Sequence, residues 1–131
     1  MGLSYDEKHH QDLGQIAHEG YSSQVNFRYF EPQDGTGFVL AETQTRTIGV
    51  LTFKVDASLN LSHHIIHVEK PYRRSGVGET LMGMYFQNDP FKLGFGVYIR
   101  AGNAKSIAFH EKLGYQKIKE AEKGILYFTR M

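Results

Sequence analysis

The stretch Val68-Glu69-Lys70-Pro71-Tyr72-Arg73-Arg74-Ser75-Gly76-Val77-Gly78 decides the fold of this 131-residue chain. It ends a strand-like run, Ser62 to Glu69, and it leads into a segment with the apolar spacing of a helix. We therefore expect a strand, a loop and a helix in that order. Gly76 and Gly78 carry no side chains at a point where backbone N–H groups face outward at a helix start, and such a start attracts phosphate.

The glycine pair alone is a weak motif, and a tight turn beside a solvated arginine pair is the alternative interpretation. The loop is not a Walker loop, because the chain has no G-x-x-x-x-G-K-[ST] sequence. It also departs from the dinucleotide fingerprint, since Leu81 stands where the third glycine would be. The rest of the chain must therefore decide between these interpretations.

Length and composition predict one domain, residues 1–131, with a single core. The formal net charge of +1 argues against a broad basic surface, so we expect no nucleic-acid partner. The chain has no cysteine, which excludes disulfides, thiol catalysis and cysteine-ligated metal. No stretch is apolar enough to span a membrane, and a cytoplasmic protein is expected.

The remaining pattern predicts a mixed α/β fold. Ser4 to Glu7 have the spacing of a capping box, so a helix is expected from there to Gly20. Two further helices are expected, one from Val77 to a stop at Asn88 and one from Asn103 to a glycine cap. Strands are expected at 25–30, 37–43, 47–55, 62–69, 94–100, 116–119 and 125–129. The run 47–55 should be central, and the order predicts a mostly antiparallel sheet that splays at one parallel strand pair, with helices flanking it.

Two segments together resemble one family. Val68-x-x-x-x-Arg73-x-x-Gly76-x-Gly78 resembles motif A of the GNAT superfamily of N-acetyltransferases, and Asn103 to Tyr115 resembles their motif B. The motifs lie in the right order, about 25 residues apart, and each falls on the expected element. The resemblance covers residues 37–131, whereas residues 1–36 match the family poorly, since members usually begin with a strand and two helices.

The resemblance implies a site for acetyl-CoA. The loop would hold the pyrophosphate through residues that combine positive charge with outward N–H groups: Arg73, Arg74, Ser75, Gly76, Val77 and Gly78. Val68 would pair with the pantetheine arm as an added strand does. Asn103 would bond that arm and Phe109 would pack against it. A plain helix N-cap for Asn103 and a core position for Phe109 remain the alternatives.

The resemblance also implies catalytic groups. The Val68 N–H would face the thioester carbonyl and stabilise the oxyanion. His110 stands where many members have a tyrosine that protonates the leaving thiolate, and a histidine can also act as an acid near neutrality. His64, nine residues before Arg73, is the candidate base, because arylalkylamine acetyltransferases carry a histidine at a similar place. A surface position for His110 and a half-exposed histidine strand are the alternatives.

No metal is expected, because adjacent histidines of a strand, such as His63 and His64, point to opposite faces. The predicted function is the transfer of the acetyl group of acetyl-CoA to a primary amine by direct attack in a ternary complex. The acceptor would be a small-molecule or peptide amine, and a homodimer is left open. A catalytically weak module that binds CoA or acetyl-CoA is the alternative function.

Overall fold

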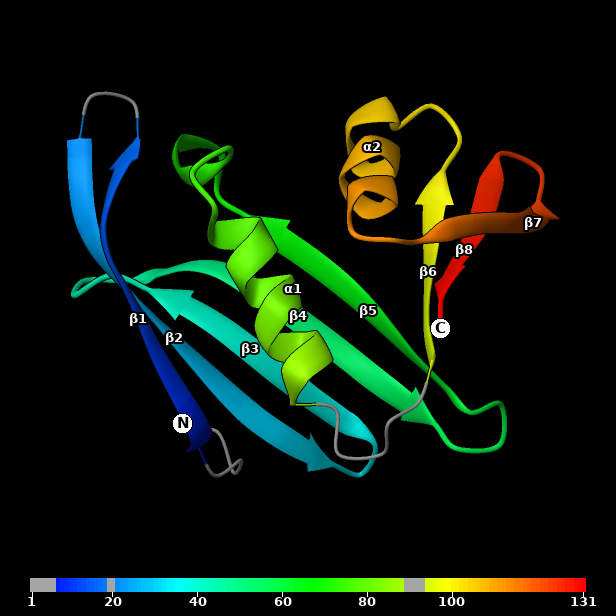
Figure 1. Ribbon diagram of the computed structural model, residues 1–131, viewed down its shortest axis with the longest axis horizontal. Coiled ribbons are helices and arrows are strands. Elements are labelled where there is room, and N and C mark those ends of the chain that lie inside the picture. The colour runs from blue at the N-terminus through cyan, green and yellow to red at the C-terminus, as the bar shows by residue number, and fades with distance from the viewer. Residues whose placement is uncertain (1–6, 19–20, 89–93) are drawn as a thin grey trace. The chain divides into compact units, whose positions relative to one another are not determined.

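The computed structural model describes residues 7–18, 21–88 and 94–131, with side chains from residue 24 onward. The elements in chain order are β1 (Glu7–His18), β2 (Tyr21–Gln33), β3 (Thr36–Glu42), β4 (Thr47–Asp56), β5 (Leu61–Val68), the 3-10 turn η1 (Lys70–Tyr72), α1 (Val77–Gln87), β6 (Gly94–Arg100), α2 (Ala104–Lys112), β7 (Gln116–Glu122) and β8 (Ile125–Arg130) (Figure 1). Within these residues, no helix is long and apolar enough to cross a membrane.

The strands are ordered β1-β2-β3-β4-β5-β6-β8-β7 in one mixed sheet. β1, β2, β3 and β4 pair in antiparallel fashion, as do β6, β8 and β7, whereas β5 and β6 are parallel. β4 is the fourth of the eight strands, which confirms the central place predicted for it. The predicted fold class, a mostly antiparallel α/β sheet with one parallel pair and flanking helices, is confirmed.

The chain divides into two compact units, which are described separately. The N-terminal unit comprises Met1–Lys54 and Ile65–Phe91, and the C-terminal unit comprises Val55–His64 and Lys92–Met131. The division falls inside β4 and inside β5, so β5 contributes to both units. The single domain expected from the length stays a prediction.

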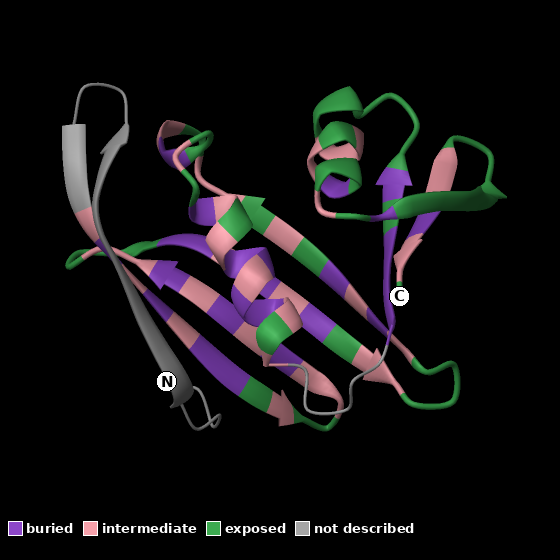
Figure 2. Cartoon of the chain, viewed as in Figure 1, coloured by how far each residue is buried: buried purple, intermediate pink, exposed green. Residues whose placement is uncertain are grey.

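In the N-terminal unit, α1 covers one face of the sheet. Residues alternate between buried and half-exposed along β2 and β3, as a sheet covered on one face requires (Figure 2). Gly49 of β4 lies under the helix, where an added Cβ would come within 3.2 Å of Leu81 and 3.3 Å of Val77. The Phe53 and Tyr85 rings, 4.9 Å apart, continue the same core. This packing holds the start of α1 directly over the central strands.

The helix predicted from Ser4 to Gly20 is wrong. Residues Glu7–His18 form β1, which pairs with β2 from Glu7 opposite Phe30 to His18 opposite Tyr21. The helical spacing of the apolar residues was sparse, and pairing along a neighbouring strand overrides so weak a local preference. The two ends of that predicted helix, residues 4–6 and 19–20, lie outside the described residues.

In the C-terminal unit, the parallel pairing of β5 with β6 is short. It joins Leu61 to Gly94, Ser62 to Phe95 and His63 to Gly96. β5 itself continues to Val68, so its last residues lie beyond the final rung of this ladder. α2 starts at Ala104 and ends at Lys112, followed by Gly114 with φ of 95°. Both the helix and its glycine cap agree with the prediction.

Candidate active site

The loop from β5 to α1 has the backbone shape of an anion-binding nest. Arg74 and Gly76 both adopt left-handed backbone conformations, with φ of 64° and 91°, on either side of Ser75. Alternation of this kind turns successive N–H groups to one side of the chain. α1 begins immediately afterwards at Val77, and the first N–H groups of any helix have no partner within it. The loop therefore presents backbone donors and a helix N-terminus together.

Internal hydrogen bonds hold this loop in place. The Ser75 hydroxyl donates to the Tyr72 carbonyl, and the Thr80 hydroxyl donates to the Gly76 carbonyl at 2.9 Å. Around Gly76 the space is open, since an added Cβ would meet no atom within 4 Å. Arg73 and Arg74 are exposed beside it. The loop is thus formed in advance, open and positively charged, as an anion site needs to be.

Val68, the last residue of β5, has its two backbone groups in different situations. Its neighbour Glu69 donates its N–H to Ile48 of β4 at 2.8 Å. Because backbone groups alternate along a strand, those of Val68 point to the edge away from β4. The Val68 carbonyl accepts a hydrogen bond from Arg73 Nε at 2.8 Å. A ligand at this edge would therefore meet the Val68 N–H as a donor, with the carbonyl already engaged.

In the C-terminal unit, two of the predicted catalytic residues contact each other. His64 Nε2 lies 3.0 Å from His110 Nε2, and the ring centroids are 5.1 Å apart. Both side chains are buried, with exposures of 5% for His64 and 2% for His110. Burial, together with His110 and His63, lowers the pKa of His64 to about 3. Burial also lowers the pKa of His110, against the Ser106 carbonyl, which raises it. Both imidazoles are therefore neutral at pH 7, and the surface position considered for His110 is wrong.

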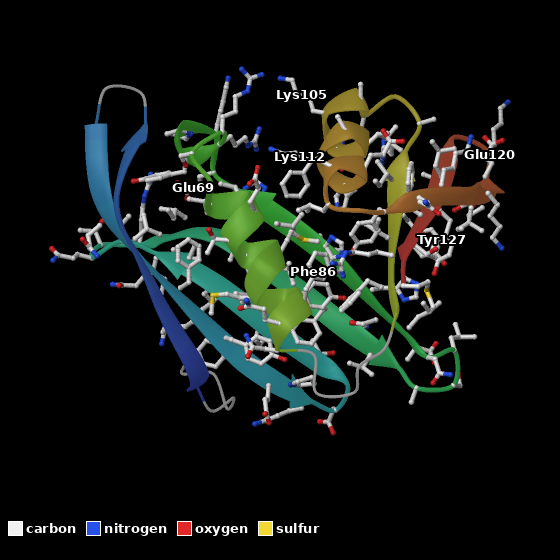
Figure 3. All side chains as sticks on the ribbon, viewed as in Figure 1. Glu69, Phe86, Lys105, Lys112, Glu120 and Tyr127 are labelled. Atoms are coloured by element: carbon white, nitrogen blue, oxygen red, sulfur yellow. The ribbon has the colours of Figure 1, made fainter. Side chains whose placement is uncertain are left out.

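The neighbouring His63 faces the other way. Its Nε2 lies 2.9 Å from the hydroxyl of Tyr127, which Figure 3 labels on β8, and its ring stacks on Tyr98 at 5.7 Å. Tyr98 is 58% exposed, so this cluster lies at the surface. Burial lowers the pKa of His63, while Asp56 raises it. Adjacent histidines of one strand thus occupy opposite faces, as predicted.

The two motif B residues predicted to contact the cofactor are Asn103 and Phe109, and Asn103 also has a structural role. The Asn103 carbonyl oxygen caps α2 by accepting the Ser106 N–H at 3.1 Å, which leaves its amide nitrogen outside the cap. Phe109 is half-exposed and meets the His110 ring edge-on at 5.2 Å, so it is not a core residue. The cofactor contacts predicted for both residues stay predictions. Among the described residues, no group of three His, Asp or Glu side chains is placed to hold a metal ion.

Sequence reasoning missed two members of the histidine site. The Tyr115 hydroxyl lies 3.5 Å from His64 Nδ1, and the Ser106 carbonyl lies 2.8 Å from His110 Nδ1. A signal existed for Ser106, because it precedes His110 by four residues in a predicted helix and its carbonyl therefore faces that turn. For Tyr115, which ends the motif B segment, the sequence carries no comparable signal.

The sequence matches the model of the acetyltransferase (GNAT) family over residues 6–115. The chain belongs to this GNAT family. Among curated proteins, no sequence matches this acetyltransferase-family chain closely enough to count as a relative.

Solved structures agree with the family. The ribosomal-protein-S18-alanine N-acetyltransferase from Escherichia coli has 17% identity and a TM-score of 0.63, covering 76% of this chain and 70% of that one. The ribosomal-protein-alanine N-acetyltransferase from Brucella melitensis has 22% identity and a TM-score of 0.64, covering 75% and 70%. The PaiA N-acetyltransferase from Thermoplasma acidophilum in complex with coenzyme A has 17% identity and a TM-score of 0.64, covering 73% and 60%. At these identities the likeness establishes the GNAT fold.

Proposed function

We propose that this GNAT protein is a cytoplasmic N-acetyltransferase that moves the acetyl group of acetyl-CoA to a primary amine of a small molecule or peptide. One observation carries the proposal: the left-handed Arg74 and Gly76 lead directly into the N-terminus of α1. This shape collects N–H donors for a pyrophosphate, which is the most highly charged inner part of CoA. The family match and the CoA-bound PaiA structure support the same ligand.

The residues suit the cofactor in different ways. The loop donors from Arg74 to Gly78 would hold the pyrophosphate, with Arg73 and Arg74 adding charge. The Val68 N–H would donate a hydrogen bond to a carbonyl of the acetyl-pantetheine arm, whereas the Val68 carbonyl already accepts one from Arg73 Nε. Asn103 and Phe109 are the proposed contacts of the same arm from motif B. Lys112, on α2 (Figure 3), and Arg74 are candidate partners for the outer phosphates.

Transfer would proceed by direct attack. The acceptor ammonium first loses a proton, and its nitrogen then attacks the thioester carbonyl carbon. As the carbonyl oxygen becomes negative, the Val68 N–H would stabilise it, a role worth about 3 kcal/mol elsewhere. The carbon–sulfur bond then breaks, and the CoA thiolate takes up a proton. His64 is the proposed base and His110 the proposed acid.

Replacing Gly78 with aspartate tests the loop. The new carboxylate would face the pyrophosphate, and two like charges about 4 Å apart repel by on the order of 1–4 kcal/mol. We expect CoA affinity, measured by calorimetry, to fall at least about tenfold. Folding should survive, because an acidic side chain in the first turn of a helix is stabilising. Gly83→Asp is the matched control, since Gly83 lies further along α1 with open space around it; equal affinities for the two variants would refute the loop assignment.

Turnover separates the enzyme from a weakly active CoA-binding module. Both would be stabilised thermally by acetyl-CoA, so binding alone cannot distinguish them. We expect thiol release from acetyl-CoA in the presence of a panel of primary amines that includes peptides with free N-termini. CoA binding without release for any amine would favour the module.

A further inference from the structure

The two faces of the sheet in the C-terminal unit differ. One face carries α2, because His64 of β5 contacts His110 of that helix. Successive side chains of a strand point to opposite faces, so the neighbouring His63 lies on the other face. Parallel pairing places His63 beside Gly96 of β6 on that side. We call this side the outer face of the C-terminal unit.

The outer face is apolar over much of its length. At one end, an added Cβ on Gly94 would lie 2.6 Å from Met131 Sδ and 3.2 Å from the side chain of Leu61, so both side chains lie over this glycine. Further along, Tyr98 of β6 pairs with Tyr127 of β8. Met131 is 87% exposed and Tyr98 58%. A contiguous apolar surface of this kind is typical of a site that another molecule covers.

Three rings form the middle of the outer face. The Tyr98 ring stacks on His63 at 5.7 Å and packs on Tyr127 at 4.7 Å, and His63 Nε2 lies 2.9 Å from the Tyr127 hydroxyl. Gly96 lies beneath them, where an added Cβ would overlap the Tyr127 hydroxyl. The rings therefore lie close against β6 and hold one another in place. Rigid aromatic side chains lose little conformational entropy when a partner covers them, and they contribute much of the energy of protein interfaces.

Opposite charges lie at the two ends of the outer face. Burial lowers the pKa of His63, and Asp56, the last residue of β4, lies near enough to raise it. Arg100 is exposed and ends β6 on the same face as Tyr98. It lies at the far end of β6 from Gly94, about 20 Å away at the usual rise per residue. The negative charge is therefore at one end of the strands and the positive charge at the other.

This distribution of charge is complementary to itself. A two-fold axis that lies in the plane of the outer face, across its strands, reverses the strand direction of the second copy. The Asp56 end of each copy then meets the Arg100 end of the other, so the same attraction occurs twice. The axis also brings the Tyr98 side chains of the two copies together near the centre. An aromatic centre with charges at its rim is the usual arrangement of a protein interface.

We propose that the outer face of the C-terminal unit is a homodimer interface, centred on Tyr98, in which Asp56 of each copy pairs with Arg100 of the other. The proposal is independent of the acetyltransferase function, since it uses none of the residues assigned to acetyl-CoA or to catalysis. Burial of the aromatic centre supplies most of the affinity. The charge pairs at the rim set the orientation of the two copies and speed their association.

The oligomeric state of the full-length wild-type chain is the first test. In sedimentation experiments at concentrations up to about 100 μM, we expect twice the mass of one chain, because interfaces of ordinary size bind in the micromolar range or more tightly. A chain that stays monomeric over this range would overturn the proposal.

Tyr98→Asp tests the centre of the interface, and Ile118→Asp is the matched control. The two residues have similar exposures, 58% and 56%, but Ile118 belongs to the edge strand β7. We expect Tyr98→Asp to raise the dissociation constant of the dimer at least about 30-fold, as the loss of a central interface residue does. Ile118→Asp should leave it nearly unchanged. A dimer that survives Tyr98→Asp, or one that only Ile118→Asp disrupts, would overturn the proposal.

An exchange of charge tests the two-fold arrangement without removing any aromatic side chain. Arg100→Glu alone places Glu opposite Asp56, and Asp56→Lys alone places Lys opposite Arg100, so each variant should dimerise more weakly than the wild type. When the two variants are mixed, both rim pairs of the mixed dimer are again of opposite charge. Native mass spectrometry should therefore show the mixed dimer in excess over the two homodimers. A statistical mixture of the three dimers, or no dimer in the mixture, would overturn the proposal.

Discussion

His63 and His64 are neighbours on β5, and each meets a tyrosine hydroxyl, yet they occupy different chemical environments. His63 belongs to a surface cluster with Tyr127 and the exposed Tyr98. His64 is buried against a second imidazole, that of His110. The alternation of a strand creates the difference, since a shift of one residue exchanges the two faces. A histidine's role therefore depends less on its position in a motif than on what lies across from its face.

The electrostatic surroundings follow the same division. The pKa of both histidines is lowered by burial, but Asp56 opposes the shift at His63, whereas His110 and His63 add to it at His64. His64 has no carboxylate among the causes of its shift. Its neutral form is therefore favoured from several directions.

The largest expected difference between the two residues is in turnover. Near pH 7, His64→Ala should lower kcat/KM about 100-fold, because general base catalysis contributes on that scale. His63→Ala should lower it less than about tenfold. At about pH 9.5 more of the acceptor amine is already deprotonated, so the loss in His64→Ala should shrink. Steady-state rates across this pH range check the prediction, and a loss that is equal at both ends would argue against His64 as the base.

A substitution at Gly96, which lies against His63 and Tyr127, should destabilise the His63 cluster and leave the His64 site unchanged. An alanine Cβ at Gly96 would lie 2.4 Å from the Tyr127 hydroxyl and 2.8 Å from His63 Nε2. We expect Gly96→Ala to lower the free energy of unfolding by about 2 kcal/mol, as overpacking does. Gly102→Ala is the control, since a Cβ there would meet nothing within 4 Å. Urea denaturation measures both, and similar stabilities would mean that the cluster is loosely packed.

Acid stability should depend on the buried histidine. The unfolded chain protonates His64 near its ordinary pKa of about 6.5, whereas the folded chain holds that pKa at about 3. Between these values the unfolded state binds more protons, so the protein loses stability as the pH is lowered, by up to about 1.4 kcal/mol per pH unit. Above pH values near 6.5 the group contributes no pH dependence. The free energy of unfolding, measured between pH 7 and about pH 5, should change less with pH in His64→Leu than in His63→Leu. Identical slopes would place the acid sensitivity elsewhere.

Much of the fold was predictable because its signals are local. Glycines, the Asn88 stop and the apolar spacing of Val77 to Tyr85 mark α1, and β6 has the predicted bounds, Gly94–Arg100. The failure at Glu7–His18 has the opposite cause. That segment has weak helical spacing, and its strand pairing with β2 depends on residues further along the chain.

The candidate site also has one part with a local sequence signal and one part that depends on distant residues. The phosphate loop could be proposed from Gly76 and Gly78 because backbone shape there depends on glycine itself. The hydrogen bond between His64 and His110 could not, since it joins residues 46 positions apart. Each was a candidate separately, one as a base and one as an acid, but only the folded structure shows that their two imidazoles are in contact.

The hydrogen bond from Arg73 to the Val68 carbonyl affects which groups can pair with this end of β5. A strand edge with alternating donors and acceptors invites another strand to pair with it, and so risks aggregation. At Val68 the carbonyl already accepts a hydrogen bond from Arg73 Nε. A second polypeptide strand would lose part of its pairing there, whereas a ligand that offers only carbonyl oxygens loses nothing. Under the proposed function, the Arg73 guanidinium would thus favour a thioester arm over a neighbouring strand at Val68.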